Sequence, residues 1–180
     1  MKQIRLHGRG GQGVVTAAEL IAIAAFNDNK FSQAFPSFGV ERTGAPIESF
    51  ARIDDKYIKL REQVQNPDIL IIQDATLLDT IDLSVGCHEN TKVIINTSKK
   101  KEEININTSV NNIYTVDATK IALEIIGKNL MNTVILGKFS QASKLVSLEG
   151  LKKAIENKFS KKGKKIIEKN IKAVEIAYQA

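Results

Sequence analysis

Residues 4–26 read IRLHGRGGQGVVTAAELIAIAAF and contain the clearest indication of the fold in this sequence. Its first four residues predict a short strand, which runs directly into a glycine-rich turn at residues 8–13. Residues 14–26 are rich in Ala, Leu and Ile and contain no Gly or Pro, so they predict a buried helix. A strand, a glycine turn and a helix in this order are typical of the start of a βαβ unit.

Three later apolar runs, residues 69–73, 92–96 and 113–116, have the composition of parallel strands buried on both faces. Helices are predicted at residues 118–126, at 132 or 133 to 145, at 148–158 and at 161–178. Residues 31–46 begin like a strand but predict an ordered loop, and residues 47–53 and 57–60 predict a hairpin around residues 54–56. The chain is therefore expected to be one α/β domain over residues 1–180, with a Rossmann-like, mainly parallel sheet flanked by helices and a β-hairpin insertion.

The net charge of +6 on the 180 residues is concentrated at one end of the chain. Residues 151–180 contain nine lysines and three glutamates, and the other 150 residues are balanced. The apolar stripe Ile167, Ile171, Val174 and Tyr178 predicts that one face of the last helix is buried and that the lysines lie on its solvated face. Because no arginine or exposed aromatic residue is interleaved with these lysines, nucleic acid is not an expected partner.

Composition also excludes several classes of site. The single cysteine, Cys87, rules out an internal disulfide and any four-cysteine iron–sulfur cluster held by this chain alone. Two histidines do not make a zinc site without distant carboxylates. The apolar runs are far shorter than the roughly 20 residues of a membrane span, and residues 1–6 do not resemble a signal peptide. We therefore expect a cytoplasmic protein with no membrane partner.

The turn Gly8-Arg9-Gly10-Gly11-Gln12-Gly13 matches the G-x-G-x-x-G pattern at its usual place between a strand and a helix. Glycines there allow a tight turn and let backbone amides approach a phosphate. A dinucleotide site also needs an acidic residue about 20 positions later, and residues 29–40 contain none. An NAD(P) site, a site for another anionic ligand and a purely structural or interface role all remain open.

Four other features have plain structural interpretations. His7 ends the first strand and is expected to be either a packed histidine or a hydrogen-bond donor to a residue of a nearby site. Asp117 is expected to cap a helix. Asp74 follows a parallel strand at the edge where α/β sheets place ligands, although it is also explained as a polar strand end. The adjacent pair Cys87-His88 lacks an orienting third group, so it is not expected to be a nucleophile and its base.

Four segments taken together resemble one known family. They resemble the gamma subunit of 2-oxoacid:ferredoxin oxidoreductases nearly end to end, and the first two segments together are specific. The segments are GRGGQG at residues 8–13, FPSFGVERTGAP at 35–46, VDATKIA at 116–122, and Asn132-Thr133 with Leu136-Gly137.

The resemblance implies a complex that oxidatively decarboxylates a 2-oxoacid on thiamine diphosphate, passes electrons through [4Fe-4S] clusters to ferredoxin and releases an acyl-CoA. In such heterotetramers thiamine diphosphate, Mg²⁺ and the clusters belong to the alpha, beta and delta subunits, so this chain would be a non-catalytic subunit. The ERTGAP sequence at residues 41–46 is similar to the pyruvate and branched-chain branch, whereas the 2-oxoglutarate branch tends to end in Arg-Gly-Gly there. The expected enzyme is therefore pyruvate synthase.

The resemblance also implies roles for two segments. The glycine turn would contact either a phosphate of coenzyme A or a partner subunit. The predicted interface residues are Phe35, Phe38, Glu41, Arg42, Thr43 and Gly44. Packing of the phenylalanines onto the core is an alternative, and a stand-alone nucleotide-binding protein of the same fold is the alternative function.

Overall fold

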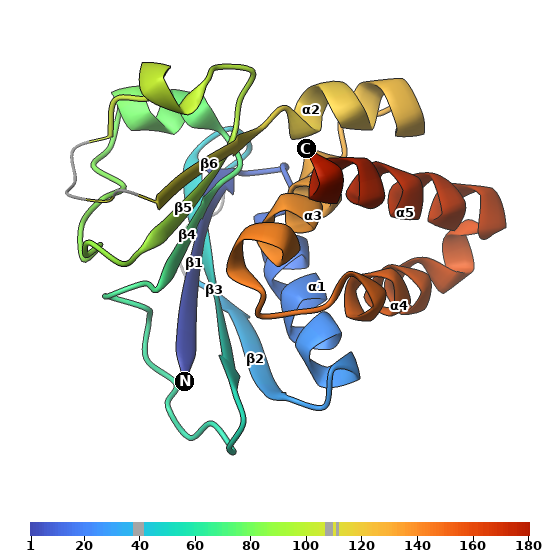
Figure 1. Cartoon of the computed structure of the whole chain (residues 1–180), viewed down its shortest axis with the longest axis horizontal. Helices are drawn as coiled ribbons and strands as arrows, with labels where there is room; N and C mark the ends of the chain where they lie inside the picture. Colours follow the sequence, from blue (N-terminus) through green and yellow to red (C-terminus); the bar gives the residue numbers. More distant parts are fainter. Residues whose placement is uncertain (38–41, 107–109, 111) are drawn as a thin grey trace.

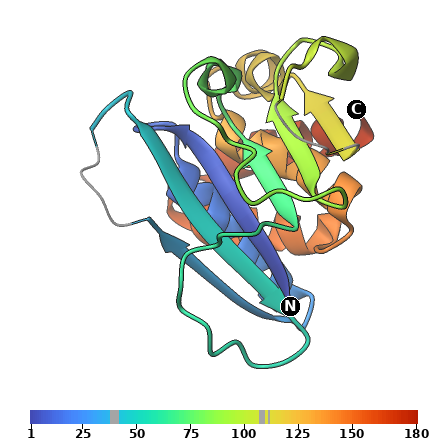
Figure 2. The same cartoon turned by 90° about the vertical axis from the view of Figure 1, so that its left-hand side faces the viewer.

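The structure is a computed structural model that describes residues 1–37, 42–106, 110 and 112–180. Within these residues one six-stranded sheet has the order β2-β3-β1-β4-β5-β6 (Figures 1 and 2). The β1·β4, β4·β5 and β5·β6 pairs are parallel, and β3 is antiparallel to both β1 and β2. The strands are β1 Lys2–Arg9, β2 Phe31–Pro36, β3 Pro46–Asp54, β4 Ile69–Ile72, β5 Lys92–Asn96 and β6 Asn112–Val116.

The long helices all lie on one side of the sheet, in two layers (Figure 1). The first layer contains α1 Val14–Asn27 and α3 Met131–Ser143, and the second contains α4 Leu148–Phe159 and α5 Lys164–Gln179. The short α2, Ala118–Ile121, continues as one π-helical turn at Ala122–Ile126 and ends at Gly127, whose φ of 83° only glycine adopts easily. The predicted cap Asp117 is confirmed, because its side chain accepts an amide hydrogen bond at the start of α2. The Ser147 side chain does the same at the start of α4.

The α/β class and the mainly parallel sheet are confirmed, but the predicted strand at residues 57–60 is wrong. The hairpin partner of β3 is β2, in the segment expected to be a loop, with the register Phe31↔Asp54 to Pro36↔Ser49. Residues 57–60 run instead across the sheet face opposite the helices, where Ile58 is buried. The alternation of Tyr57, Ile58, Lys59 and Leu60 resembles a strand, but the edge of β3 is already occupied by β2.

The two faces of the sheet are covered differently. The helical face holds the larger core, which includes Ile4, Leu6 and Ile71 together with the inner faces of α1 and α3. On the other face, segments that contain the short 3-10 helices Ala75–Asp79 and Lys101–Glu103 cover β4 and β5 (Figure 2). The chain thus leaves β1 toward the helical face and leaves β4 toward the opposite face, which makes the β1/β4 boundary a topological switch point.

The basic C-terminal segment is built as predicted. Val174, Ala173 and Ala177 of α5 are buried against α3, and Ile167 and Ile171 pack on the same core. Several lysines of α4 and α5 face carboxylates of the same chain. These ion pairs are Lys158–Glu19, Lys152–Glu175 and Lys164–Glu168.

Candidate functional site

The glycine turn is held against a second segment of the same chain. The Gly10 amide donates to the Ala45 carbonyl over 2.9 Å, and the Gly44 amide donates to the Gly10 carbonyl over 3.1 Å. A Cβ atom at Gly10 would lie 2.2 Å from the Arg42 carbonyl oxygen, so only glycine permits this approach. The structure therefore brings together two segments that the sequence analysis selected separately, residues 8–13 and 42–45.

Polar contacts also fix the turn to the end of β4. The Arg9 guanidinium lies 3.3 Å from a carboxylate oxygen of Asp74 and donates to the Thr76 hydroxyl. The Gln12 side chain accepts from the Arg9 amide and donates to Asp74 over 2.7 Å. Burial acts to raise the pKa of Asp74, but the hydrogen bonds from Thr76 and Gln12 and the Arg9 charge outweigh it and hold this pKa below its usual value. Asp74 therefore stays ionised and keeps Arg9 engaged.

A polar pocket of about 350 Å³ opens at the carboxyl ends of the parallel strands, beside the turn. Its lining combines Gln12 with residues that follow β4, β5 and β6, namely Asp74, Ala75, Thr76, Thr97, Ser98, Asp117 and Thr119. Asn96, Gln73, Asn129 and Met131 complete it. In open α/β sheets ligands bind in the crevice outside the carboxyl ends at a switch point, and this pocket has that position.

Gln73 is the residue that most strongly suggests a ligand in this pocket. It is 1% exposed, and neither its Nε2 nor its Oε1 has a hydrogen-bond partner among the described residues. Its main chain is fully engaged, since its amide donates to His7 and its carbonyl accepts from Asn96. Because an unpaired buried amide costs stability, Gln73 is suited to a bound group that supplies both a donor and an acceptor.

The arrangement does not suit an NAD(P) site. The strand that follows α1 is β2, and it contains no acidic residue. It also lies at the edge of the sheet, with β3 between it and β1. A dinucleotide site needs a carboxylate at the end of a strand next to the glycine turn, where it can reach the ribose. β2 does not provide such a carboxylate.

His7 and Arg5 lie on the face of β1 that points away from the helices. The Arg5 guanidinium donates to the carbonyls of Gln65, Leu83 and Val85, so it fixes two irregular segments onto this face. Burial first, and then the Arg5 charge, lowers the pKa of His7 to about 3. His7 is thus a neutral packed histidine, as predicted, and it does not line the pocket.

The other candidate groups do not assemble into a catalytic centre. Burial raises the pKa of the half-buried Cys87 thiol, although Arg5 acts in the opposite sense, so Cys87 is not an activated nucleophile. Within the part of the chain that the structure describes, no group of three or more His, Cys, Asp or Glu side chains has the arrangement of a metal site. Among the same residues, no helix is long and apolar enough to cross a membrane.

The predicted interface residues are placed in part. Phe38 and Glu41 lie outside the described residues, whereas Arg42, Thr43 and Gly44 are exposed beside the glycine turn. The Phe35 ring lies 5.2 Å from the Phe50 ring, and Arg52 stacks on it. Phe35 is only half-buried, so it combines core packing with an exposed surface, and the interface role of these residues stays a prediction.

Sequence reasoning missed Gln73, Asn96 and Arg5. Gln73 ends the apolar run of residues 69–73, and a polar residue at the carboxyl end of a parallel strand is itself a signal for a site. Asn96 ends the next strand, and its side chain bridges Gln73 and Thr119. Arg5 alternates with Ile4 and Leu6 as an exposed strand residue would, so no local pattern reveals its burial.

Comparison with known proteins identifies relatives of the whole chain. The sequence profile of the family described as pyruvate ferredoxin/flavodoxin oxidoreductase matches residues 3–180. Pyruvate synthase subunit PorC of Methanocaldococcus jannaschii is 51% identical over 178 residues, which are 99% of this chain and 96% of the relative. The common gamma subunit of the pyruvate/ketoisovalerate oxidoreductases of Thermococcus kodakarensis is 48% identical, with coverage of 99% and 96%.

A solved structure has the same fold. The crystal structure of pyruvate oxidoreductase subunit PORC from Thermotoga maritima superimposes with a TM-score of 0.86 at 37% sequence identity. The match covers 99% of this chain and 95% of the other. The helical layers and the mixed sheet are therefore shared with this solved structure over nearly the whole of both chains.

Proposed function

Because this chain belongs to the pyruvate ferredoxin/flavodoxin oxidoreductase family, we propose that it is the gamma subunit of a pyruvate:ferredoxin oxidoreductase, or pyruvate synthase. One observation carries this proposal: the chain aligns over 96% of a PorC subunit at 51% identity. The chain is thus similar to a complete subunit rather than to a shared nucleotide-binding module. The stand-alone nucleotide-binding alternative is also less well supported because β2 lacks the acidic residue of a dinucleotide site.

In this proposal the chain supports CoA-dependent oxidative decarboxylation without supplying a catalytic group. Thiamine diphosphate, Mg²⁺ and the [4Fe-4S] clusters are held by alpha, beta and delta partners, and electrons leave to ferredoxin. With a single cysteine, this chain does not supply the four ligands of a cluster. Pyruvate is the proposed substrate, and ketoisovalerate is the second one, since relatives carry both names. We place this complex in the cytoplasm.

The pocket beside the glycine turn supports a contact with coenzyme A. Gln73 offers an unpaired donor and an unpaired acceptor, and the amides of Gly11 and Gly13 have no hydrogen-bond partner among the described residues. Arg9 is already paired with Asp74, so a phosphate at the turn would have to attract Arg9 away from that carboxylate. The structure thus favours a site in which the Gln73 side chain and the backbone amides of the turn bind a polar group. It is less suited to a site in which a free Arg9 binds a phosphate.

Purification of the complex through an affinity tag on this chain tests the assembly. We expect the thiamine-binding and cluster-binding subunits to copurify in equal amounts with it. Recovery of the chain alone, together with micromolar affinity for NADH or FAD in calorimetry, would support the stand-alone alternative instead.

The contact with coenzyme A has its own test in the assembled enzyme. Gln73→Met keeps the length of the side chain but removes both polar atoms, and Gln65→Met makes the same change at an exposed position. We expect Gln73→Met to raise the KM for coenzyme A about tenfold, as the loss of one paired polar group predicts, while the KM for pyruvate stays unchanged. An unchanged KM for coenzyme A would place its site elsewhere.

A further inference from the structure

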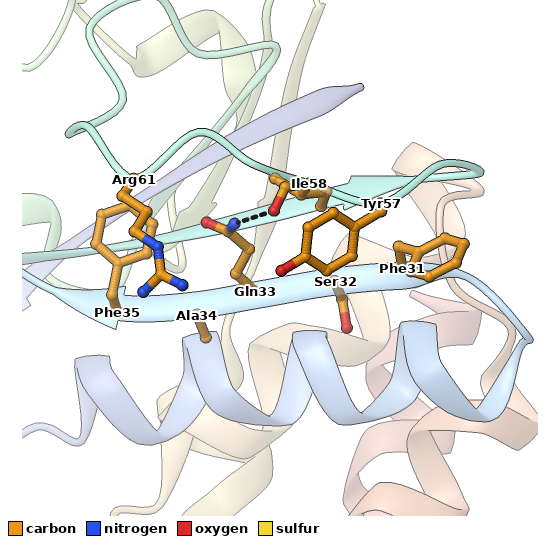
Figure 3. A pocket seen from close by; sticks show the side chains of 8 residues that line it. All are labelled: Phe31, Ser32, Gln33, Ala34, Phe35, Tyr57, Ile58 and Arg61. Carbon is orange, nitrogen blue, oxygen red and sulfur yellow. Dashed lines mark hydrogen bonds between the residues drawn. The ribbon is translucent and has the colours of Figure 1, made fainter.

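The free edge of β2 is bordered by a second, larger pocket, of about 490 Å³ (Figure 3). Residues 31–35 of β2 form one side of the pocket, and Tyr57, Ile58 and Arg61 form the other. Figure 3 shows the segment that carries Tyr57 and Arg61 passing over β2, with Ala34 pointing toward the helix on the opposite side. The Gln33 side chain joins the two sides by donating to the Ile58 carbonyl.

The main chain of β2 is available for pairing at this edge. β2 is the first strand of the sheet and pairs with β3 alone among the described residues. The Ser37 amide donates to the Glu48 carbonyl. In an antiparallel ladder every second residue bonds to the same neighbouring strand, so the main chains of residues 31, 33 and 35 also bond to β3. Ser32 and Ala34 then direct their amides and carbonyls outward, as the edge of a sheet does where another strand can add.

The side chains at this edge are aromatic and basic. Phe31 is 47% exposed and Tyr57 is 69% exposed, and their rings meet edge to face at 6.3 Å. Arg61 is the one charged residue among those that line the pocket, and it forms no ion pair among the described residues. Lys56 and Lys59 belong to the same segment, which Asp55 and Glu62 flank. The buried Arg52 guanidinium lies beneath the Phe35 ring, 5.2 Å from its centre, and its Nη1 has no hydrogen-bond partner among the described residues.

We propose that the β2 edge binds an extended segment of a partner subunit of the complex, which adds as a strand and carries an apolar and an acidic side chain on one face. This proposal rests on the proposed function for its choice of partner. The apolar side chain contacts Phe31 and Tyr57, and the carboxylate contacts Arg61. Because side chains on one face of a strand alternate, these two residues are separated by an even number of positions.

Charge argues against a second copy of this chain as the occupant. Pairing two β2 edges would bring the basic segment 56–61 of one copy toward that of the other. Like charges that face each other across an interface weaken association, whereas an acidic segment is attracted.

Hydrogen exchange at two amides tests strand addition directly. We expect the Ser32 and Ala34 amides to exchange at least about tenfold more slowly in the assembled complex than in the free chain, as newly hydrogen-bonded amides do. Assembly without this protection would overturn the inference and leave the proposed function intact. Failure of the chain to assemble at all would overturn both. Protection that appears in the free chain together with dimer formation would identify a second copy as the occupant and overturn the proposal.

Two substitutions separate the main-chain and charge contributions. Ala34→Pro removes an outward amide that the sheet does not use, and Arg61→Glu reverses the charge at the groove. Each is expected to weaken the association of the chain with its partners at least about tenfold, whereas the matched charge reversal Lys161→Glu, at the far end of the chain, leaves it unchanged. Circular dichroism and thermal melting establish that the variants are folded. Wild-type association for both folded variants would contradict the proposal.

Discussion

The environment of His7 shows how one buried side chain makes this fold sensitive to acid. Its Nε2 lies 3.9 Å from a carboxylate oxygen of Glu48 and has no hydrogen-bond partner among the described residues. Burial and the Arg5 charge lower its pKa from 6.5 to about 3. In the unfolded chain this imidazole regains its ordinary pKa, so below pH 6.5 the unfolded state binds a proton that the folded state does not.

The free energy of unfolding should therefore fall as the pH is lowered from 6.5 to 5. The slope due to His7 increases from about 0.7 kcal/mol per pH unit at pH 6.5 to about 1.4 kcal/mol per pH unit near pH 5. Urea titrations of the isolated chain across this range measure it. His7→Gln should flatten the slope by that amount, since it removes the titrating group and keeps a polar side chain. Parallel slopes for the two proteins would show that His7 is protonated normally in the folded state.

The buried side chain of Gln73 should lower the stability of the isolated chain. Because both polar atoms of this side chain are buried and have no hydrogen-bond partner in the described part of the chain, Gln73→Met should raise the free energy of unfolding of the isolated chain by about 1 kcal/mol. Denaturant unfolding measures this change, and Gln65→Met, at an exposed position, should have no comparable effect. A destabilised Gln73→Met protein would mean that the amide is satisfied in the free chain.

Among the elements, the contact between α3 and α5 depends on one glycine. A Cβ atom at Gly137 would lie 2.1 Å from the Val174 carbonyl oxygen and 2.9 Å from the Tyr178 nitrogen. The two helix backbones therefore approach more closely than any other residue permits, and α5 is positioned by this approach together with its buried apolar face.

Gly137→Ala should destabilise the chain by about 2 kcal/mol, because α5 must move away from α3 to admit the methyl group. Thermal or urea unfolding measures the loss. Lys153→Ala, at an exposed position of α4, should change stability by less than about 0.5 kcal/mol. Equal stability of the two variants would show that α5 moves at no cost.

Local sequence patterns predicted a helix or strand well where the pattern fits only one kind of structural environment. β5 has the bounds that its apolar run predicted, and α1 and α4 differ from prediction by a residue at one end. The error at residues 57–60 arose because alternation identifies a half-buried extended segment but not its partner. The sequence predicts a loop at β2 because Pro36 and the glycines after it are typical of loops. The pairing of this strand with β3 depends on a segment further along the chain.

The candidate site was predictable only in part for the same reason. Residues 8–13 and 42–44 were each recognised, but their contact through Gly10 depends on the tertiary arrangement. Gln73 is distinguished by its burial and by the absence of a side-chain partner among the described residues, and both depend on the tertiary structure. The residues next to Gln73 in the sequence do not show whether its side-chain amide is hydrogen-bonded.

The whole molecule divides into a helical side with a basic C-terminal end and a sheet side that carries both proposed binding sites. Lysines of α4 and α5 pair with acids of the same chain, and their apolar faces are buried, so the net charge does not by itself indicate a nucleic acid partner. The carboxyl-edge pocket and the β2 edge lie on the sheet, beside β4–β6 and beyond β3 respectively. This distribution is consistent with a subunit that meets protein partners and coenzyme A at different places.

In the proposed function, this chain is required as a subunit of a pyruvate:ferredoxin oxidoreductase. CoA-dependent reduction of ferredoxin by pyruvate, measured for the partner subunits purified with and without this chain, tests this requirement. We expect the assembled complex to reduce ferredoxin, omission of this chain to abolish the reduction, and adding it back to restore it. Equal rates of ferredoxin reduction with and without the chain would show that the chain is not required.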